Sequence, residues 1–235
     1  MDLIRTLHHL NIFKNISEAS LRELQNHSKV LLLNSRELLA EKGAPVQDVF
    51  VVLHGALKMQ MKNPFGDFVI FHFLTRGDTI GGLFSTNPEH GYGSQFVAIE
   101  DSAVLQIPNS IFQKLIATEP SVAAYLHHEA MERLLELHHE KFLLRGHIPE
   151  KVADLFLRLL DRQGPHAGSR ILIKLSLNDV ARKIGAEPES VIRHISQWKK
   201  NEWVRIENKH IEVLNRPALE ALTQHQRILA AVAPA

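Results

Sequence analysis

The chain has 235 residues, a formal net charge of +1 and no cysteine. The absence of cysteine excludes disulfides, thiol nucleophiles and iron–sulfur clusters, and no apolar run approaches the roughly 20 residues that span a bilayer. A hydrophobic content of 45% with 23% charged residues is typical of a soluble globular protein of one large or two modest domains. We therefore expect a cytoplasmic protein without a membrane partner, in which nucleic-acid binding would depend on locally placed positive charge.

The first half of the chain changes from helical to strand patterns. The stretch from Leu3 to about Leu33 favours helix, with Phe13 closing a short segment and Ser17 capping a second one. From Leu31 to about Pro108, short apolar runs alternate with glycine-containing turns. Several short strands at this spacing predict an antiparallel sandwich or barrel.

A long helix is predicted from about Pro120 to Leu144. Small, apolar and a few polar residues recur along it in two interleaved sets with a period of seven, which favours pairing of two helices across a two-fold axis. The residues of this predicted seam are Ala123, His127, Ala130, Leu134, Leu137, Lys141 and Leu144. The alternative is an amphipathic helix packed only on its own domain. Glu132–Arg133 and Glu136–Glu140 are interpreted as solvated faces.

The stretch from Ser176 to Lys200 has the pattern of a helix-turn-helix. Ser176 caps the first helix, Gly185 supplies the backbone freedom of a tight turn, and Pro188 suits the start of a second helix. Apolar residues of the second helix face the core, which leaves a polar face near its N-terminus, where a DNA-recognition helix contacts base edges. The polar candidates are Glu189, Ser190, Arg193 and His194. The alternative is an ordinary surface helical hairpin.

Flanking segments complete a winged helix-turn-helix pattern. A hinge is expected at Arg145–Pro149, and a strand from Arg170 to Leu175 leads into the helix-turn-helix. Trp203–Ile206 and His210–Leu214 are expected to pair as a β-hairpin, the wing. Further DNA-binding candidates, chiefly for phosphate contacts that position the protein without specifying sequence, are Ser176, Lys199, Asn208 and Lys209.

In this order of parts the chain resembles the Crp/Fnr superfamily of bacterial transcription regulators over nearly its whole length. The stretches that carry the resemblance are EKGAPVQDVFVVLHGALKM, RGDTIGGLF, FVAIEDSAVLQIP and GAEPESVIRH. It implies an α+β chain with an antiparallel, jelly-roll-like β-roll sensor domain at residues 1–119. A dimerisation helix and hinge follow at 120–146, and a winged helix-turn-helix domain at 147–235.

The resemblance also implies a function. A homodimer would bind palindromic double-stranded DNA and regulate transcription, with activation through contacts of the loop from Gln163 to Arg170 with RNA polymerase. Glu189 and Arg193 occupy the positions where family members contact a C and a G. An arginine fork suits guanine O6 and N7 and a glutamate accepts from cytosine N4, each pair being worth about 1–3 kcal/mol. Pro188 and Ile192 depart from the family pattern, so the half-site should retain a G-A step, whereas the sequence leaves its outer bases open.

The expected effector pocket departs from the family members that bind cyclic AMP. Those members use a Gly–Glu–Leu run, an Arg–Ser pair and a Thr–Ser pair of the long helix. A buried monoanion would here lack its charge partner, so standard cyclic AMP recognition is not expected. The residues at the corresponding positions are Gly81, Gly82, Leu83, Tyr92, Ser94, Gln95, Leu137 and His138.

Two other sensing modes stay open. Histidines could hold haem or a metal ion, which would make the protein a gas or redox sensor with DNA binding as its output. The candidates are His72, His127 and His138. Alternatively, aromatic side chains fill the pocket and hold an active state without a ligand; these are Phe71, Phe73, Phe84, Tyr92 and Phe96. Enzymatic activity is not expected, because no nucleophile elbow, P-loop or HExxH pattern is present.

Overall fold

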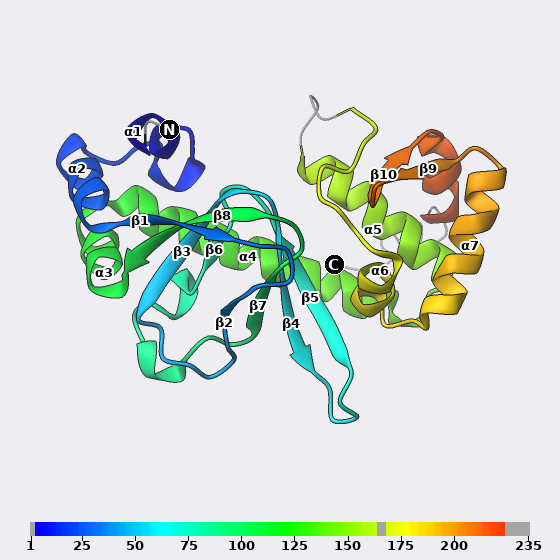
Figure 1. Cartoon of the computed structure of the whole chain (residues 1–235), viewed down its shortest axis with the longest axis horizontal. Coiled ribbons are helices and arrows are strands. Elements are labelled where there is room, and N and C mark those ends of the chain that lie inside the picture. The colour runs from blue at the N-terminus through cyan, green and yellow to red at the C-terminus, as the bar shows by residue number, and fades with distance from the viewer. Residues whose placement is uncertain (1–2, 164–167, 224–235) are drawn as a thin grey trace, which may run out of the picture. The chain divides into compact units, whose positions relative to one another are not determined.

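The computed structural model describes residues 3–163 and 168–223. By the contacts among their residues they divide into two compact units, Met1–Lys141 and Phe142–Ala235, each with its own helices and strands (Figure 1). Residues 164–167 of the loop expected to contact RNA polymerase lie outside the described part. Within the described residues, no helix combines the length and the apolar character needed to span a bilayer.

Two four-stranded antiparallel sheets form the centre of the first unit, with the strand orders β1-β8-β3-β6 and β2-β7-β4-β5. The strands are β1 Lys29–Leu33, β2 Leu38–Ala40, β3 Asp48–His54, β4 Leu57–Lys62, β5 Phe68–Leu74, β6 Thr79–Ile80, β7 Gln95–Ala98 and β8 Ser102–Pro108. Residues of both sheets share one hydrophobic core, to which Val51 and Leu105 contribute from the first sheet and Leu57 and Phe96 from the second. The antiparallel sandwich predicted from the strand pattern is confirmed.

Helices precede and follow the sheets of the first unit. They are α1 Leu3–His8, α2 Glu18–His27, α3 Asn109–Thr118 and α4 Pro120–Phe142, with the short 3-10 turns η1 Asn11–Phe13, η2 Gly82–Phe84 and η3 Pro88–His90. The Ser17 hydroxyl accepts a hydrogen bond from the Ser20 backbone and caps α2, as predicted. The expectation of helix up to Leu33 is wrong. Lys29–Leu33 pairs with β8 as an edge strand, and this long-range pairing was not visible in the local helical pattern.

Glu119 anchors the start of α4. Its Oε1 accepts hydrogen bonds from the Ser17 hydroxyl (2.5 Å), the Ser20 hydroxyl (2.6 Å) and the Ser17 backbone N–H (3.0 Å). These bonds, chiefly the one from the Ser17 hydroxyl, hold the pKa of Glu119 below its ordinary value because they favour the charged form. The start of α4 is therefore tied to the start of α2.

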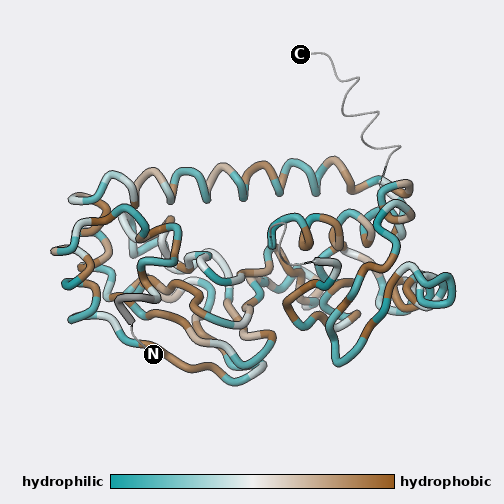
Figure 2. The backbone as a smooth tube through the Cα atoms, turned by 90° about the horizontal axis from the view of Figure 1, so that it is seen from above, coloured by the Kyte–Doolittle hydropathy of each residue, from teal (hydrophilic) through white to brown (hydrophobic). Residues whose placement is uncertain are grey.

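One face of α4 packs on the first unit. Val122, Leu126 and Glu129 are buried, and their spacing of four and three residues defines a single inner face. In the hydropathy view, hydrophobic and hydrophilic stretches alternate along this long helix (Figure 2). The apolar residues outside the inner face are exposed to solvent in the single chain, a point that matters for the predicted seam.

The second unit has the winged helix-turn-helix order. Its elements are η4 Leu143–Arg145, α5 Ile148–Arg162, α6 Leu177–Ile184, α7 Pro188–Lys200, β9 Val204–Glu207 and β10 His210–Val213, followed by a helical segment over residues 216–223. The strand expected from Arg170 to Leu175 is wrong. Only Arg170 forms a β-bridge, with Glu212, because the chain bends at residues 172–173 and interrupts the ladder.

Candidate nucleic-acid interface and ligand cavity

Local backbone chemistry sets the geometry of the helix-turn-helix. The Ser176 hydroxyl accepts a hydrogen bond from the Asp179 backbone N–H (3.1 Å) and donates to the Asp179 carboxylate (2.6 Å), which caps α6. Gly185 ends α6 in the left-handed conformation, with φ 66° and ψ 45°, where a side chain would be strained. The Ser176 hydroxyl is therefore used by the cap, where it helps to position α6.

The two faces of α7 differ sharply. Val191, Ile195 and Trp198 are buried, with exposed fractions of 0%, 1% and 4%. The Trp198 ring packs edge-on against Phe156 of α5, with centroids 6.3 Å apart, and lies 6.3 Å from the ring of Trp203. The buried side chains therefore fix the inner face of α7, and α7 cannot rotate freely about its axis on α5.

The outer face of α7 carries the predicted base-reading side chains. Glu189 and Arg193 are exposed, whereas Ser190 and His194 are half-buried. Arg193 Nη2 donates to the Ser190 hydroxyl over 3.2 Å, which holds the guanidinium against the first turn of the helix. One helix face thus presents a carboxylate acceptor and a guanidinium donor one turn apart.

The wing turn places two candidate phosphate contacts. Asn208 and Lys209 link β9 to β10 with φ values of 50° and 67°, the pattern of a two-residue type I′ turn. Both side chains are exposed, as is that of Lys199 in the last turn of α7. The backbone oxygen of Lys209 accepts from the Leu175 N–H over 2.9 Å, so the wing is tied to the start of the helix-turn-helix.

Lys209→Gly should separate the stability of this turn from its charge. Lysine in the left-handed conformation is strained and glycine is not, so the free energy of unfolding should rise by about 0.5–1 kcal/mol. Loss of the ammonium group should weaken binding to cognate and scrambled DNA alike and lower its salt dependence. Urea unfolding and fluorescence anisotropy measure the two effects. Lys209→Asn, which also tolerates this conformation, should behave similarly; a fall in stability in both variants would contradict the strain argument.

A cavity of about 320 Å³ lies in the first unit. It is lined by Met59, Met61, Phe71, His72, Gly81, Leu83, Phe84, Gly93, Ser94, Phe96, Arg133, Glu136 and Leu137. Among the expected effector residues, Gly81, Leu83, Ser94 and Leu137 are in this lining. Its walls thus come from strands β4 and β5, the region around η2, the start of β7 and helix α4.

The other expected effector residues lie elsewhere. Tyr92 is in the core, where its hydroxyl donates to the Asp48 carbonyl over 2.6 Å and its burial raises its pKa to about 12. Gln95 lies between Ser94 and Phe96, so strand alternation turns it to the opposite face. Gly82 is buried but does not line the cavity, and His138 is exposed on α4.

Acidic and basic side chains of α4 reach the cavity, where two of them make close contacts. His72 Nδ1 donates to Glu136 Oε2 over 2.6 Å. Arg133 Nη2 donates to Glu129 Oε1 (2.6 Å) and to the Thr79 carbonyl (2.9 Å). The expectation that Arg133 and Glu136 lie on solvated faces is wrong, because their side chains are only 19% exposed.

Several cavity residues were not predicted from the sequence, although the spacing of some of them places them on one face. Met59 and Met61 alternate along one strand, and Arg133, Glu136 and Leu137 fall on one side of α4 at spacings of three and four. These patterns show that residues share a face. They do not show that the two faces meet, which requires the packing of α4 on the sheets.

The candidate histidine ligands are not brought together. His72 is buried and paired with Glu136, whereas His127 and His138 are exposed on α4, eleven residues or about 16 Å apart along the helix. In the described part of the chain, no group of three or more His, Cys, Asp or Glu side chains could hold a metal ion. In one copy of the chain, His72, His127 and His138 therefore do not point to a common ligand site.

The predicted seam of α4 is largely open to solvent in one copy of the chain. Leu134 and Leu137 are 44% and 48% exposed, and Leu144, which lies in η4, is 69% exposed. The remaining seam residues are exposed or half-buried: Ala123, His127, Ala130 and Lys141. Leu137 belongs both to the predicted seam and to the cavity lining.

Comparison with known proteins matches both units. Residues 31–119 match the family model described as a cyclic nucleotide-binding domain, and residues 150–222 match the Crp-like helix-turn-helix domain. Electron transport regulator A of Shewanella oneidensis is 24% identical over 195 residues, covering 82% of this chain and 77% of that protein. The nitrogen fixation regulation protein FixK of Bradyrhizobium diazoefficiens is 24% identical over 216 residues, covering 90% and 89%. The solved structure of FixK2 from Bradyrhizobium japonicum shares the fold, with a TM-score of 0.71 and 23% identity over 83% of this chain and 96% of that one.

Proposed function

Because this chain belongs to the Crp/Fnr family of DNA-binding transcription regulators, we propose that it binds a palindromic DNA site as a homodimer. Each copy inserts α7 into a major groove, with the half-sites about one helical turn, roughly 34–36 Å, apart. The observation that carries the proposal is the two-faced α7. Its apolar side is buried on α5, and its polar side presents Glu189 and Arg193 to solvent.

Arg193 and Glu189 are the base-reading residues in this proposal. The guanidinium donates two parallel hydrogen bonds to guanine O6 and N7, and the carboxylate accepts from cytosine N4. A carboxylate next to DNA phosphates is otherwise unfavourable, so Glu189 discriminates against sites that lack this cytosine. The Arg193–Ser190 hydrogen bond of 3.2 Å supports the proposal, because it already restricts the Arg193 side chain in the free protein. Less conformational entropy is then lost when the guanidinium binds DNA.

Phosphate contacts supply the remaining affinity. Lys199 and Lys209 carry the charge, Asn208 and His194 offer hydrogen bonds, and the Ser176 cap holds α6 in place. The net charge of the whole chain is only +1, so attraction to DNA depends on these locally placed groups.

Dimerisation and activation complete the proposal. The exposed seam of α4 pairs with the same seam of a second copy. Without this pairing, the side chains of Leu134 and Leu137 remain exposed to water. The regulator acts in the bacterial cytoplasm, where the genome lies. Activation would use the loop from Gln163 to Arg170 as a contact for RNA polymerase.

Fluorescence anisotropy tests the proposal on the full-length protein. At about 150 mM salt, a labelled Crp/Fnr-type palindrome with a G-A step in each half-site should bind at least about 10³-fold more tightly than a scrambled duplex of equal composition. The affinity should be measured alone and with haemin or cyclic AMP added. Equal affinity for the two duplexes under all three conditions would contradict the proposal.

A further inference from the structure

The cavity of the first unit is mainly apolar. Its volume of about 320 Å³ falls within the usual range of small-molecule sites, about 300–1,000 Å³. Met59 and Met61 line one wall and Phe71, Phe84 and Phe96 line others. Methionine side chains adapt to the shape of an apolar ligand, and aromatic rings offer flat contact surfaces.

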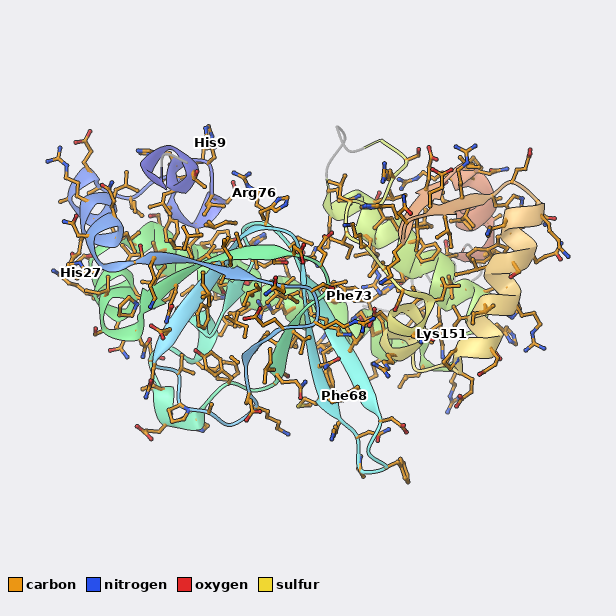
Figure 3. All side chains as sticks on the ribbon, viewed as in Figure 1. His9, His27, Phe68, Phe73, Arg76 and Lys151 are labelled. Carbon is orange, nitrogen blue, oxygen red and sulfur yellow. The ribbon has the colours of Figure 1, made fainter. Side chains whose placement is uncertain are left out.

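The basic groups of the cavity wall are already paired with acidic ones. Among the described residues that line it, His72 and Arg133 are the basic side chains. His72 contacts Glu136, and Arg133 contacts Glu129, each over 2.6 Å. Arg76, a further cation of this unit, is exposed on the turn between β5 and β6 and is not part of the lining (Figure 3).

An anionic ligand is therefore poorly matched to this wall. It would have to break the Arg133–Glu129 pair to find a cation, which would leave the Glu129 carboxylate, 9% exposed, without that partner. A ligand that buried its negative charge without a cation nearby would lose its hydration, and no attractive interaction would offset that free-energy cost. An uncharged ligand meets neither penalty.

Aromatic side chains of the chain itself do not occupy this space. Tyr92 and Phe73 are buried and do not line the cavity, Tyr92 packing against Phe96 with ring centroids 6.1 Å apart, while Phe71, Phe84 and Phe96 form walls around the remaining volume. Leu83, Phe84 and Leu137 of the lining are 37%, 38% and 48% exposed, so they mark an entrance from solvent.

The lining also contains one hydroxyl group. Ser94 lines the cavity and is 5% exposed, and its hydroxyl is not one of the buried unpaired side-chain atoms of the described residues, which are Gln60 Oε1 and Asn109 Oδ1. A serine hydroxyl can both donate and accept a hydrogen bond. A ligand with one hydrogen-bonding group would pair with it while its apolar part contacts the methionines and phenylalanines.

We propose that this cavity is the binding site of an uncharged, largely apolar small molecule that carries a hydrogen-bonding group facing Ser94. That the small molecule acts as an effector rests on the proposed DNA-binding function. That it binds in the cavity does not depend on that function. The paired charges of its wall thus distinguish the site from one built for an anionic nucleotide.

Two fluorescent probes with the same ring skeleton test the charge argument. N-phenyl-1-naphthylamine is uncharged, and 1-anilinonaphthalene-8-sulfonate adds one sulfonate to the same rings. The full-length protein should bind the uncharged probe saturably at one site per chain and at least about tenfold more tightly than the sulfonated one. An excess of cyclic AMP should not displace it. Equal or tighter binding of the sulfonated probe, or displacement by cyclic AMP, would overturn the proposal.

Variants of the lining test the location. Leu83→Trp and Met61→Trp place a larger side chain into the cavity from partly exposed positions on η2 and β4, and both should weaken the uncharged probe at least about tenfold. Leu32→Trp is the matched control, because Leu32 is exposed on β1 and outside the lining. If the control weakens the probe as much as the two cavity variants, or the cavity variants leave its affinity unchanged, the probe binds elsewhere and the proposal fails.

DNA binding of the same variants distinguishes the two proposals. Palindrome selectivity without probe binding would refute the cavity proposal alone. Cavity-dependent probe binding without palindrome selectivity would refute the DNA-binding proposal alone. Near-ultraviolet circular dichroism confirms that each variant is folded before either measurement is used.

Discussion

Arg193→Ala is expected to abolish the preference for the cognate palindrome while leaving salt-sensitive background binding in place. Each bidentate contact to guanine is worth about 1–3 kcal/mol, and a palindrome contains it twice, so the selectivity should fall by roughly 30-fold to 10⁴-fold. Anisotropy titrations with the palindrome and the scrambled duplex at several salt concentrations measure both quantities.

Two further variants show whether the loss comes from the shape of the side chain or from its charge. Arg193→Lys keeps the positive charge but lacks the planar fork, so it should lose most of the selectivity as well. Lys199→Ala removes an exposed charge at the other end of α7 and should weaken both duplexes equally. Unchanged selectivity in both Arg193 variants would exclude a base-reading role for this residue.

Leu134→Glu is expected to dissociate the homodimer. Leu134 is 44% exposed in the single chain, and in the proposed seam it meets its symmetry mate. Replacing it loses about 2 kcal/mol or more of apolar packing in each copy and sets two carboxylates face to face, so the dimer should weaken roughly 10³-fold or more. Analytical ultracentrifugation at micromolar concentration measures the change, and affinity for the palindrome should fall with it.

The neighbouring residue provides the control. Leu135 is 55% exposed on the same helix, but a rotation of about 100° per residue turns it away from the seam. Leu135→Glu should therefore leave the dimer intact. If both variants dissociate the dimer equally, a broader apolar face of α4 forms the interface; if neither does, the predicted seam is wrong.

Short-range patterns in the sequence were enough for the helix-turn-helix. The Ser176 cap, the left-handed Gly185 and the alternation of apolar and polar residues on α7 each depend on neighbours within a few positions. The antiparallel strands were likewise visible from their spacing and turns. The division of α7 into a buried and an exposed face could therefore be predicted, and the structure confirms the fold that follows from it.

Long-range pairing accounts for the errors in secondary structure. Lys29–Leu33 continues a helical pattern but gains the hydrogen bonds of β8, and Arg170–Leu175 alternates like a strand but finds only one bridging partner, Glu212. For Lys29–Leu33 the partner strand β8 decides the outcome, whereas Arg170–Leu175 lies along β10 and a bend at residues 172–173 interrupts the ladder.

The cavity required the tertiary structure, for a physical reason. Arg133 and Glu136 have the spacing of solvated helix residues, and only the packing of α4 on the sheets buries them opposite Thr79 and His72. Helical position can indicate the Arg133–Glu129 pair, whose members are four residues apart on α4, but not the His72–Glu136 contact, which joins residues 64 positions apart. The sequence therefore predicted that the family's cyclic nucleotide contacts are missing, whereas packing determined that a paired, mainly apolar site replaces them.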